Sequence, residues 1–336
     1  MDLANEEETS EQLTAIAESV VKRIVSVASR SLAGAAAENR SYQWAIIGLG
    51  KLGGREMNFG SDLDIFFVHA EEQDEGQCVD YVTSLAQEVL RLLCENTEYG
   101  VLYEVDTRLR PEGKHGPLSL SIDGFREYLR KRVAQWERQA LTFSRVIVSA
   151  PQPRFGEVVE EAIWNAIAVK PTREIFESAL SMRLRMQEQA QSNYGTRPNI
   201  KTGFGGLVDA EFIAQLGRMI GGVRLSEGRK GDTRATLECM RSAGLLPDRV
   251  AQTLMDAYHA LRRIQMHLRV NDYRAHNVLP DDEDAILTLA RGLGFRDRSD
   301  LSVHVEKVTE DMRGAFLLAL ESLATANTKA LGGSLV

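Results

Sequence analysis

Apolar residues recur every three to four positions near the start of the chain, and this spacing predicts an amphipathic helix over residues 7–38. The apolar positions are Leu13, Ile16, Val20, Ile24 and Val27. The pattern breaks between Gly34 and Asn39, where alanine, glycine and asparagine replace it. We therefore expect a lead-in helix within residues 1–40.

The texture changes at Trp44, where short apolar runs replace the helical spacing. The runs WAIIG at 44–48 and LDIFFVH at 63–69 predict two strands, and GVLYEVDTRLRP at 100–111 predicts a third that ends at Pro111. Between the second and third, residues 77–96 form an amphipathic helical pattern with Val82, Leu85, Val89 and Leu92 on one stripe. This segment predicts a small α/β domain over residues 41–150.

After Pro151 and Pro153 the strand signals fade and long helical patterns follow, at 173–190, 209–220 and 250–270. The predicted apolar faces are Ile175, Ala179, Met182 and Met186 in the first, and Tyr258, Leu261, Ile264 and Leu268 in the last. Such stripes are typical of the core of a helical bundle. The expected fold class is α+β, with a catalytic domain at 41–150 and an all-α bundle at 151–336.

The composition is that of an ordinary globular protein: 336 residues with 43% hydrophobic and 26% charged side chains. No run approaches the roughly 18 apolar residues that a membrane helix needs. The acidic start lacks the cationic and apolar regions of a signal peptide. Three scattered cysteines suggest neither disulfides nor zinc, and the six histidines form no close ligand pair. We expect a soluble, cytoplasmic protein that does not act at a membrane.

A net charge of −8 argues against a general nucleic-acid-binding protein, because such proteins need a cationic surface to displace counterions from phosphates. A small anionic substrate remains compatible with this charge if a local basic patch holds it.

The stretch IIGLGKLGGREMNFGSDLDIFF, residues 46–67, contains a possible dinucleotide-binding motif. Gly48, Gly50 and Gly53 satisfy G-x-G-x-x-G directly after a strand. Only eight residues separate Gly53 from Asp62, too few for the crossover helix of a Rossmann unit, and the acids come at the start of the second strand rather than at its end. The phosphate-binding motif GxxxxGK[ST] is absent as well.

The two aspartates explain the stretch better. Side chains at i and i+2 point to the same side of a strand, so Asp62 and Asp64 direct two carboxylates to one place. Two adjacent like charges are costly without a cation, and hard oxygen ligands suit Mg²⁺. The alternative is that Ser61 and Asp62 merely begin a strand and Asp64 is a solvated edge residue, since such acids are common in turns.

The third predicted strand supplies a further carboxylate. Asp106 ends it, and Arg108 and Arg110 follow at alternating positions that point with Asp106. Three carboxylates beside two guanidinium groups are what metal-assisted phosphoryl or nucleotidyl transfer requires. Arg108 and Arg110 as plain surface ion-pair partners are the alternative.

These motifs resemble a known family. A glycine pair followed by D-x-D on a strand and a third aspartate on a later strand is similar to the DNA polymerase β-type nucleotidyltransferase superfamily, with the departure that Gly50 is followed by Lys51. Four long motifs in order resemble the glutamine synthetase adenylyltransferase (glutamate-ammonia-ligase adenylyltransferase) family, from about residue 44 to at least residue 220: GLGKLGGREMNFGSDLDIFFV, YEVDTRLRPEGKHGPLSLS, WERQALTFSRVIV and IKTGFGGLVDAEFIAQ.

The resemblance implies one catalytic half of an enzyme that regulates nitrogen assimilation. One half of such enzymes transfers AMP from ATP to a tyrosine of glutamine synthetase, and the other removes it by phosphorolysis with release of ADP. Asp62, Asp64 and Asp106 would hold Mg²⁺, two ions in all, and Asp106 would help take the proton of the tyrosine hydroxyl. Glutamine synthetase would be the partner, and a PII-type regulatory protein is a further candidate.

The nucleotide would be held by the glycine turn and by cationic groups: Gly50, Lys51, Gly53, Gly54, Ser61, Arg108, Arg110 and Lys201. Each glycine is equally explained by a tight turn. Asp209 and Glu211 either stabilise a helix N-terminus or face the metal site. In WERQAL we expect Trp136 in the core, and Glu137 and Arg145 as either supporting residues or a buried pair.

YEVDTRLRP and WERQAL look more like the adenylylating half than the removing half, so AMP transfer is the preferred expectation. Other classes stay open: a non-catalytic regulatory domain that kept the fold, a nucleotidyltransferase acting on a small alcohol, and, least favoured, a Rossmann oxidoreductase. Retention of all the aspartates counts against the first of these, and the long helical region favours a protein acceptor over a small one.

Overall fold

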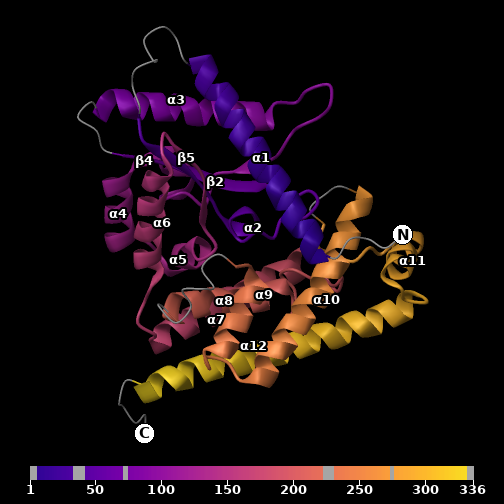
Figure 1. Cartoon of the computed structure of the whole chain (residues 1–336). Coiled ribbons are helices and arrows are strands. Elements are labelled where there is room, and N and C mark those ends of the chain that lie inside the picture. Colours follow the sequence, from indigo (N-terminus) through magenta and orange to yellow (C-terminus); the bar gives the residue numbers. More distant parts are fainter. Residues whose placement is uncertain (1–5, 33–41, 71–74, 222–230, 273–275, 331–336) are drawn as a thin grey trace. The chain divides into compact units, whose positions relative to one another are not determined.

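The computed structural model describes residues 6–32, 42–70, 75–221, 231–272 and 276–330 (Figure 1). The chain divides into two compact units, one from Glu7 to Ile167 and a second that includes the chain from Ala168 onward. They are called the N-terminal unit and the helical unit below, and each is described by itself.

A small mixed sheet is the centre of the N-terminal unit. Its strands are β1 (Trp44–Gly48), β2 (Leu63–His69), β3 (Val105–Asp106), β4 (Ser119–Ser121) and β5 (Arg145–Ala150). The order is β3-β2-β1-β5, and β4 also pairs with β2. β1 is antiparallel to both β2 and β5, whereas β3 and β4 run parallel to β2. The predictions of β1 and β2 are confirmed at both ends of each strand.

Helices cover both faces of this sheet (Figure 1). α1 (Glu6–Leu32) and α3 (Glu75–Cys94) pack on the face that carries Ile46, Ile65 and Phe67. α4 (Ile122–Lys131), α5 (Gln135–Leu141) and α6 (Pro153–Ile167) pack on the face of Ile47, Phe66 and Val68. Because side chains alternate along β1 and β2, each strand contributes to both cores.

The first predicted helix is present but its buried face is rotated. Ala17, Val21, Val25 and Ala28 face the core, while Leu13, Val20 and Ile24 are only partly buried and Ile16 is 54% exposed. The small alanines allow α1 to approach the sheet closely, so the face includes residues that a count of large side chains overlooks. The end of the prediction, residues 33–38, lies outside the described residues.

Two other expectations differ from the structure. The third strand, expected over 100–111, is reduced to Val105–Asp106, because a turn precedes it and the loop through Arg110 and Pro111 follows it. The N-terminal unit also extends past the boundary expected at 150. α6 follows Pro151, and its Phe155, Val159, Ile163 and Ile167 are buried in the core beneath β1 and β5.

The helical unit contains α7 (Arg173–Tyr194), α8 (Leu207–Gly221), α9 (Thr233–Ser242), α10 (Asp248–Asp272), α11 (Glu283–Leu293) and α12 (Arg298–Ala330). α8 packs against α9, α10 and α12. The predicted face of α10 is confirmed, since Tyr258, Leu261, Ile264 and Leu268 are all buried. The face of α7 is shifted: Phe176, Ala179, Arg183 and Ala190 are buried, whereas Ile175, Met182 and Met186 are half-buried.

None of the helices in the described part of the chain has the length and apolar character that crossing a membrane requires.

Candidate functional site

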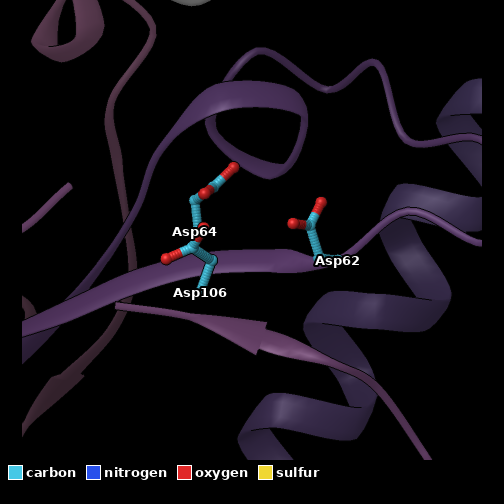
Figure 2. Close-up of side chains that lie close together, drawn as sticks. All are labelled: Asp62, Asp64 and Asp106. Atoms are coloured by element: carbon cyan, nitrogen blue, oxygen red, sulfur yellow. The ribbon is translucent and has the colours of Figure 1, made fainter. Parts of the chain in front are cut away.

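Three carboxylates converge at one edge of the sheet. Asp62 directly precedes β2, Asp64 lies within it, and Asp106 ends β3. One oxygen from each lies within 4.8 Å of the others, and Figure 2 shows the three side chains gathered beside the strands. The parallel pairing of β2 and β3 places Asp64 opposite Asp106, so the pairing of the two strands itself builds the cluster.

The alternation of β2 explains why the acids remain in reach of solvent. Leu63 and Ile65 are buried against the side of the sheet that α1 and α3 cover. Asp62 and Asp64 therefore project to the opposite side, the one on which Phe66 and Val68 enter the second core further along the strand. Asp62 is exposed and Asp64 and Asp106 are half-buried, so all of these carboxylates remain partly accessible to solvent.

The glycine turn packs directly against this cluster. Gly50 begins α2 (Gly50–Gly53) with a φ of +52°, and a Cβ atom there would lie 2.6 Å from Oδ2 of Asp64. The Leu49 amide donates to the Asp64 carbonyl over 2.9 Å, which fixes the turn to β2. At Gly53 a Cβ would lie 1.9 Å from the carbonyl oxygen of Phe143. Both glycines thus permit contacts that no side chain would allow.

Lys51 and Ser61 take part in local contacts of this turn region. The Nζ of Lys51 lies 3.3 Å from Oε2 of Glu56, and the pair is largely shielded from solvent. The Oγ of Ser61 accepts from the amide of Asn58 over 3.0 Å, and the Ser61 amide donates back to the Asn58 carbonyl. Ser61 thereby closes the loop that delivers Asp62 to the start of β2. Gly54 ends α2, with its amide donating to the carbonyl of Gly50.

Arg108 forms an ion pair with Asp106. Its Nε lies 2.8 Å from Oδ2 and 3.0 Å from Oδ1 of Asp106, its amide donates to Oδ1 over 2.7 Å, and Nη2 also contacts Oδ2. The hydrogen bond and charge of Asp106 raise the pKa of Arg108, and the charges of Asp62 and Asp64 add to this effect. The Arg108 side chain is 66% exposed, so this cation is held by charge rather than by packing.

Arg110, which was expected beside Asp106, lines the same depression as Asp106 and is anchored in the loop that follows β3. It is buried, and it donates through Nε to the Gly116 carbonyl over 3.0 Å and through Nη1 to both the carbonyl and the hydroxyl of Thr107. The chain leaves the extended conformation after Asp106, so the expected alternation no longer applies. Arg110 holds the loop that follows β3.

A depression of about 460 Å³ opens at the cluster. Its lining residues are Asp62, Glu104, Val105, Asp106, Thr107, Arg108 and Arg110. Glu104 and Thr107 were not singled out from the sequence, although the position of Glu104 two residues before Asp106 was an available signal.

The residues present fit a divalent cation such as Mg²⁺. The donor set consists of hard carboxylate oxygens close enough to share one ion, and one of the three carboxylates, Asp106, is paired with the guanidinium of Arg108. The depression leaves one side open for further oxygen ligands, which suits Mg²⁺ because this ion keeps water or phosphate oxygens in its shell.

Arg145 supports the glycine turn from behind. Its Nη2 lies 2.6 Å from Oε1 of Glu18 on α1 and 3.1 Å from the Leu52 carbonyl, and its Nε lies 3.4 Å from the Gly53 carbonyl. Burial alone would raise the pKa of Glu18, but the hydrogen bond and charge of Arg145, helped by Lys22, lower it overall. Arg145 therefore forms a partly buried ion pair and also contacts the turn.

Glu137 stabilises the start of α5. Its Oε2 accepts from the Ala134 amide over 2.7 Å and caps α5, while Oε1 accepts from the hydroxyl of Tyr128. Burial and this hydrogen bond raise the pKa of Tyr128 to about 12. Trp136 was expected in the core, which is wrong: its side chain is 46% exposed.

Lys201, Asp209 and Glu211 lie in the helical unit. Asp209 is fully buried between two arginines, with Arg183 contacting its Oδ1 and Nε of Arg313 lying 3.0 Å from its Oδ2. Burial raises the pKa of Asp209 despite these cations. Arg183 also donates to the carbonyls of Thr202 and Gly203, so Asp209 and Arg183 together fix the glycine-rich loop IKTGFGG at 200–206. Glu211 is half-buried on α8, and the Lys201 amide donates to Oδ1 of Asn199 over 3.0 Å.

The fold and the site define a mixed α/β unit with a carboxylate cluster, and comparisons with known proteins assign it further. Residues 1–158 match the family described as glutamate-ammonia ligase adenylyltransferase, and residues 174–316 match the one described as GlnD PII-uridylyltransferase. Similar proteins named bifunctional glutamine synthetase adenylyltransferase/adenylyl-removing enzyme occur in Ralstonia nicotianae (32% identical over 305 residues), Psychromonas ingrahamii (31% over 283) and Xanthomonas axonopodis pv. citri (33% over 267).

These alignments cover 81%, 81% and 76% of this chain but only 31%, 29% and 28% of the respective relatives. The chain belongs to the glutamine synthetase adenylyltransferase family, and it spans about a third of the length of the curated relatives it matches.

Proposed function

We propose that the N-terminal unit is a polymerase β-type nucleotidyltransferase that uses Mg²⁺ to transfer AMP from ATP to a tyrosine of glutamine synthetase. The observation that carries this proposal is the convergence of Asp62, Asp64 and Asp106 within 4.8 Å at an open edge of a mixed sheet. Family membership supports it, because the matched residues 1–158 contain all of these aspartates and the glycine turn.

In this proposal the three carboxylates hold the metal, and bound Mg²⁺ supplies charge neutralisation at the phosphates. The tyrosine oxygen forms a bond to the α-phosphorus, the bond from that phosphorus to the leaving pyrophosphate breaks, and the hydroxyl proton leaves to a base. Asp106 is the proposed acceptor, and Arg108, which is exposed enough to move, turns from Asp106 to the phosphates.

The glycine turn positions the nucleotide. Because Gly50 has no side chain, the backbone of the turn lies directly against Oδ2 of Asp64, so that a phosphate can meet the carboxylate and the backbone of the turn together. Arg145 keeps α2 in place through the carbonyls of Leu52 and Gly53. In this proposal Lys51, Ser61 and Gly54 contribute to the same turn.

Adenylyl removal is the second candidate activity, because the relatives carry both activities in their names. It uses the same carboxylates with phosphate as the attacking group and releases ADP. The sequence around Asp106 and WERQAL, which resembles the adenylylating half, favours transfer for this chain.

The test is a pair of assays with the same protein. The chain is incubated with Mg²⁺, α-labelled ATP and unmodified glutamine synthetase, and in parallel with adenylylated synthetase and phosphate. Label on the synthetase is the expected result, whereas ADP release without label would assign removal. No label transfer and no ADP release from a folded protein would overturn the proposal. Assays with free tyramine and small alcohols as acceptors would then distinguish an enzyme that acts on small acceptors from a non-catalytic protein.

A further inference from the structure

An aromatic side chain stands almost fully in solvent in the turn that leads to β3. Tyr99 is 91% exposed, and Val101 and Leu102 next to it are 47% and 51% exposed. These residues belong to the turn at 95–102, called the Tyr99 turn below, which connects α3 to β3. Exposed aromatic and aliphatic side chains that gather in one place are characteristic of protein-binding surfaces.

Hydrogen bonds fix the conformation of the Tyr99 turn. The backbones of Thr97 and Gly100 exchange two hydrogen bonds of 3.0 Å, and the Thr97 hydroxyl donates to the Gly100 carbonyl over 2.8 Å. The Tyr99 amide donates to the Thr97 hydroxyl oxygen, and Gly100 takes a φ of +95° that closes the turn. At its base the Tyr103 amide donates to the carbonyl of Leu93, whose side chain is fully buried. Tyr99 is therefore presented by a preorganised turn, which lowers the entropic cost of binding.

The charge around the turn specifies the chemistry of its partner. Glu98 and Glu104 are exposed, and neither forms an ion pair with another described residue. Glu95 has a carboxylate too, already paired with Arg91. An apolar tip in a segment that also carries the exposed carboxylates of Glu98 and Glu104 complements a protein surface that has an apolar pocket with basic residues at its rim. The same acidic surroundings oppose nucleic acid and anionic membranes.

The turn is also continuous with the site. Glu104 lines the depression together with Asp62 and Asp106, and Leu102 lies only two residues before it. A protein that binds the tip therefore contacts the segment that leads directly to Glu104 and Asp106. A small alcohol acceptor would need no such element.

We propose that the Tyr99 turn is the docking site for the protein acceptor, with Tyr99 inserted into an apolar pocket that has a basic rim. This inference rests on the proposed function and extends it from the chemistry of transfer to recognition of the acceptor. Tyr99 and its neighbours act on the affinity for the acceptor protein, and not on the affinity for ATP or on the chemical step.

The experiment compares three variants of the full chain: Tyr99→Ser, the charge reversal Glu98→Lys, and the control Ile16→Ser. Ile16 is an exposed large hydrophobic residue of the same unit, on α1. Initial rates of AMP transfer give KM for glutamine synthetase and for ATP separately, and surface-immobilised synthetase gives Kd for each variant without ATP. Thermal unfolding and sedimentation velocity report the fold and the oligomeric state.

We expect Tyr99→Ser to raise KM and Kd for the synthetase by at least about tenfold, as for an aromatic residue at the centre of an interface, with KM for ATP, kcat and Tm unchanged. Glu98→Lys raises the same two constants to a smaller extent, in a salt-dependent manner, and Ile16→Ser changes none of them. Unchanged constants for Tyr99→Ser in a chain that transfers AMP would overturn the docking proposal and leave the proposed function intact.

Two further outcomes would show that the proposed function is wrong or that the Tyr99 turn binds something other than the acceptor protein. A chain that binds the synthetase through Tyr99 but neither adds nor removes AMP would overturn the proposed function and retain the docking site. Dissociation of a dimer by Tyr99→Ser, or a lower Tm, would show that the turn is covered by a second copy or by the chain itself, and either result would overturn the docking proposal.

Discussion

A Cβ atom on Gly50 would lie 2.6 Å from Oδ2 of Asp64, so the glycine turn and the carboxylate touch with no room for a side chain. Gly50 also has a φ of +52°, where an L-amino acid is strained. Gly50→Ala is therefore expected to lower stability by about 1–3 kcal/mol from strain and to impair activity as well, because the new methyl group displaces Asp64.

Gly244→Ala is the matched control for this prediction. Gly244 has a φ of +68° and nothing within 4 Å of the added Cβ, so it carries the backbone strain without the clash. Urea unfolding and AMP transfer are measured for both variants. A loss of stability in both variants, with activity lost only in Gly50→Ala, is the expected pattern. Full activity of Gly50→Ala would show that the turn does not position Asp64.

The carboxylate cluster leads to a second prediction. Asp62→Asn or Asp64→Asn should reduce turnover on the order of a thousandfold, since a metal contributes several kcal/mol to phosphoryl transfer. Stability should stay the same or rise, because one of several adjacent like charges is removed. Chelation of divalent ions should abolish the activity of the unaltered chain, and Mg²⁺ should restore it.

Asp80→Asn, at an exposed position on α3, is the control for these variants. Turnover and thermal unfolding are measured side by side. Retention of turnover in both cluster variants would exclude the metal site.

The ion pair between Glu18 and Arg145 predicts a pH dependence. The folded-state pKa of Glu18 lies below its ordinary value of 4.5, because Arg145 and Lys22 outweigh the opposite effect of burial. The stabilisation it contributes is therefore fully present above that value and is lost as the pH falls through the lower folded-state pKa. Glu18→Gln should be less stable than the unaltered chain at neutral pH, with the difference shrinking in acid.

Urea unfolding of the two proteins from neutral to acidic pH measures this difference. Because Arg145 also contacts the carbonyls of Leu52 and Gly53, we expect KM for ATP to rise in Glu18→Gln. Parallel stability curves across the pH range would contradict the assignment to Glu18.

The buried position of Asp209 predicts an effect on stability. Asp209→Asn leaves Arg183 and Arg313 without their counter-charge inside the helical unit, and such a change typically costs about 3–5 kcal/mol. Asp256→Asn, at an exposed position on α10, is the comparison in urea unfolding. Unchanged stability with lost activity would instead indicate a chemical role for Asp209.

Sequence patterns predicted those helices and strands in which large apolar side chains recur at a regular spacing. The strands around Ile46 and Phe66 and the stripe of α10 have large apolar side chains at regular spacing, and all are present as predicted. The buried face of α1 was predicted wrongly because it contains Ala17 and Ala28, whose small side chains allow close packing but do not stand out in the sequence. α4, α5 and β5 were not predicted, since their short segments give no long period to detect.

For the site, local spacing was informative only while the backbone stayed extended. It placed Asp62 and Asp64 together because Asp62 directly precedes β2 and Asp64 lies within it, whereas Asp106 reaches them through the pairing of β3 with β2. It did not show that Arg110, past the end of β3, is buried in the loop there, and it misplaced Trp136, which is exposed on α5. The partners of Asp209 come from residues distant in sequence, Arg183 and Arg313, and no local pattern indicates them.

The alternation along β2 has a consequence for folding fidelity. Asp64, Phe66 and Val68 share one side of the strand, and Leu63, Ile65 and Phe67 share the other. A slip of one residue against β1 would exchange the two sides and drive Asp64 into the layer under α1 and α3, an error far more costly than a misplaced apolar residue. The carboxylate of Asp64, which is proposed to bind the metal, therefore also disfavours a misaligned pairing of β2 with β1.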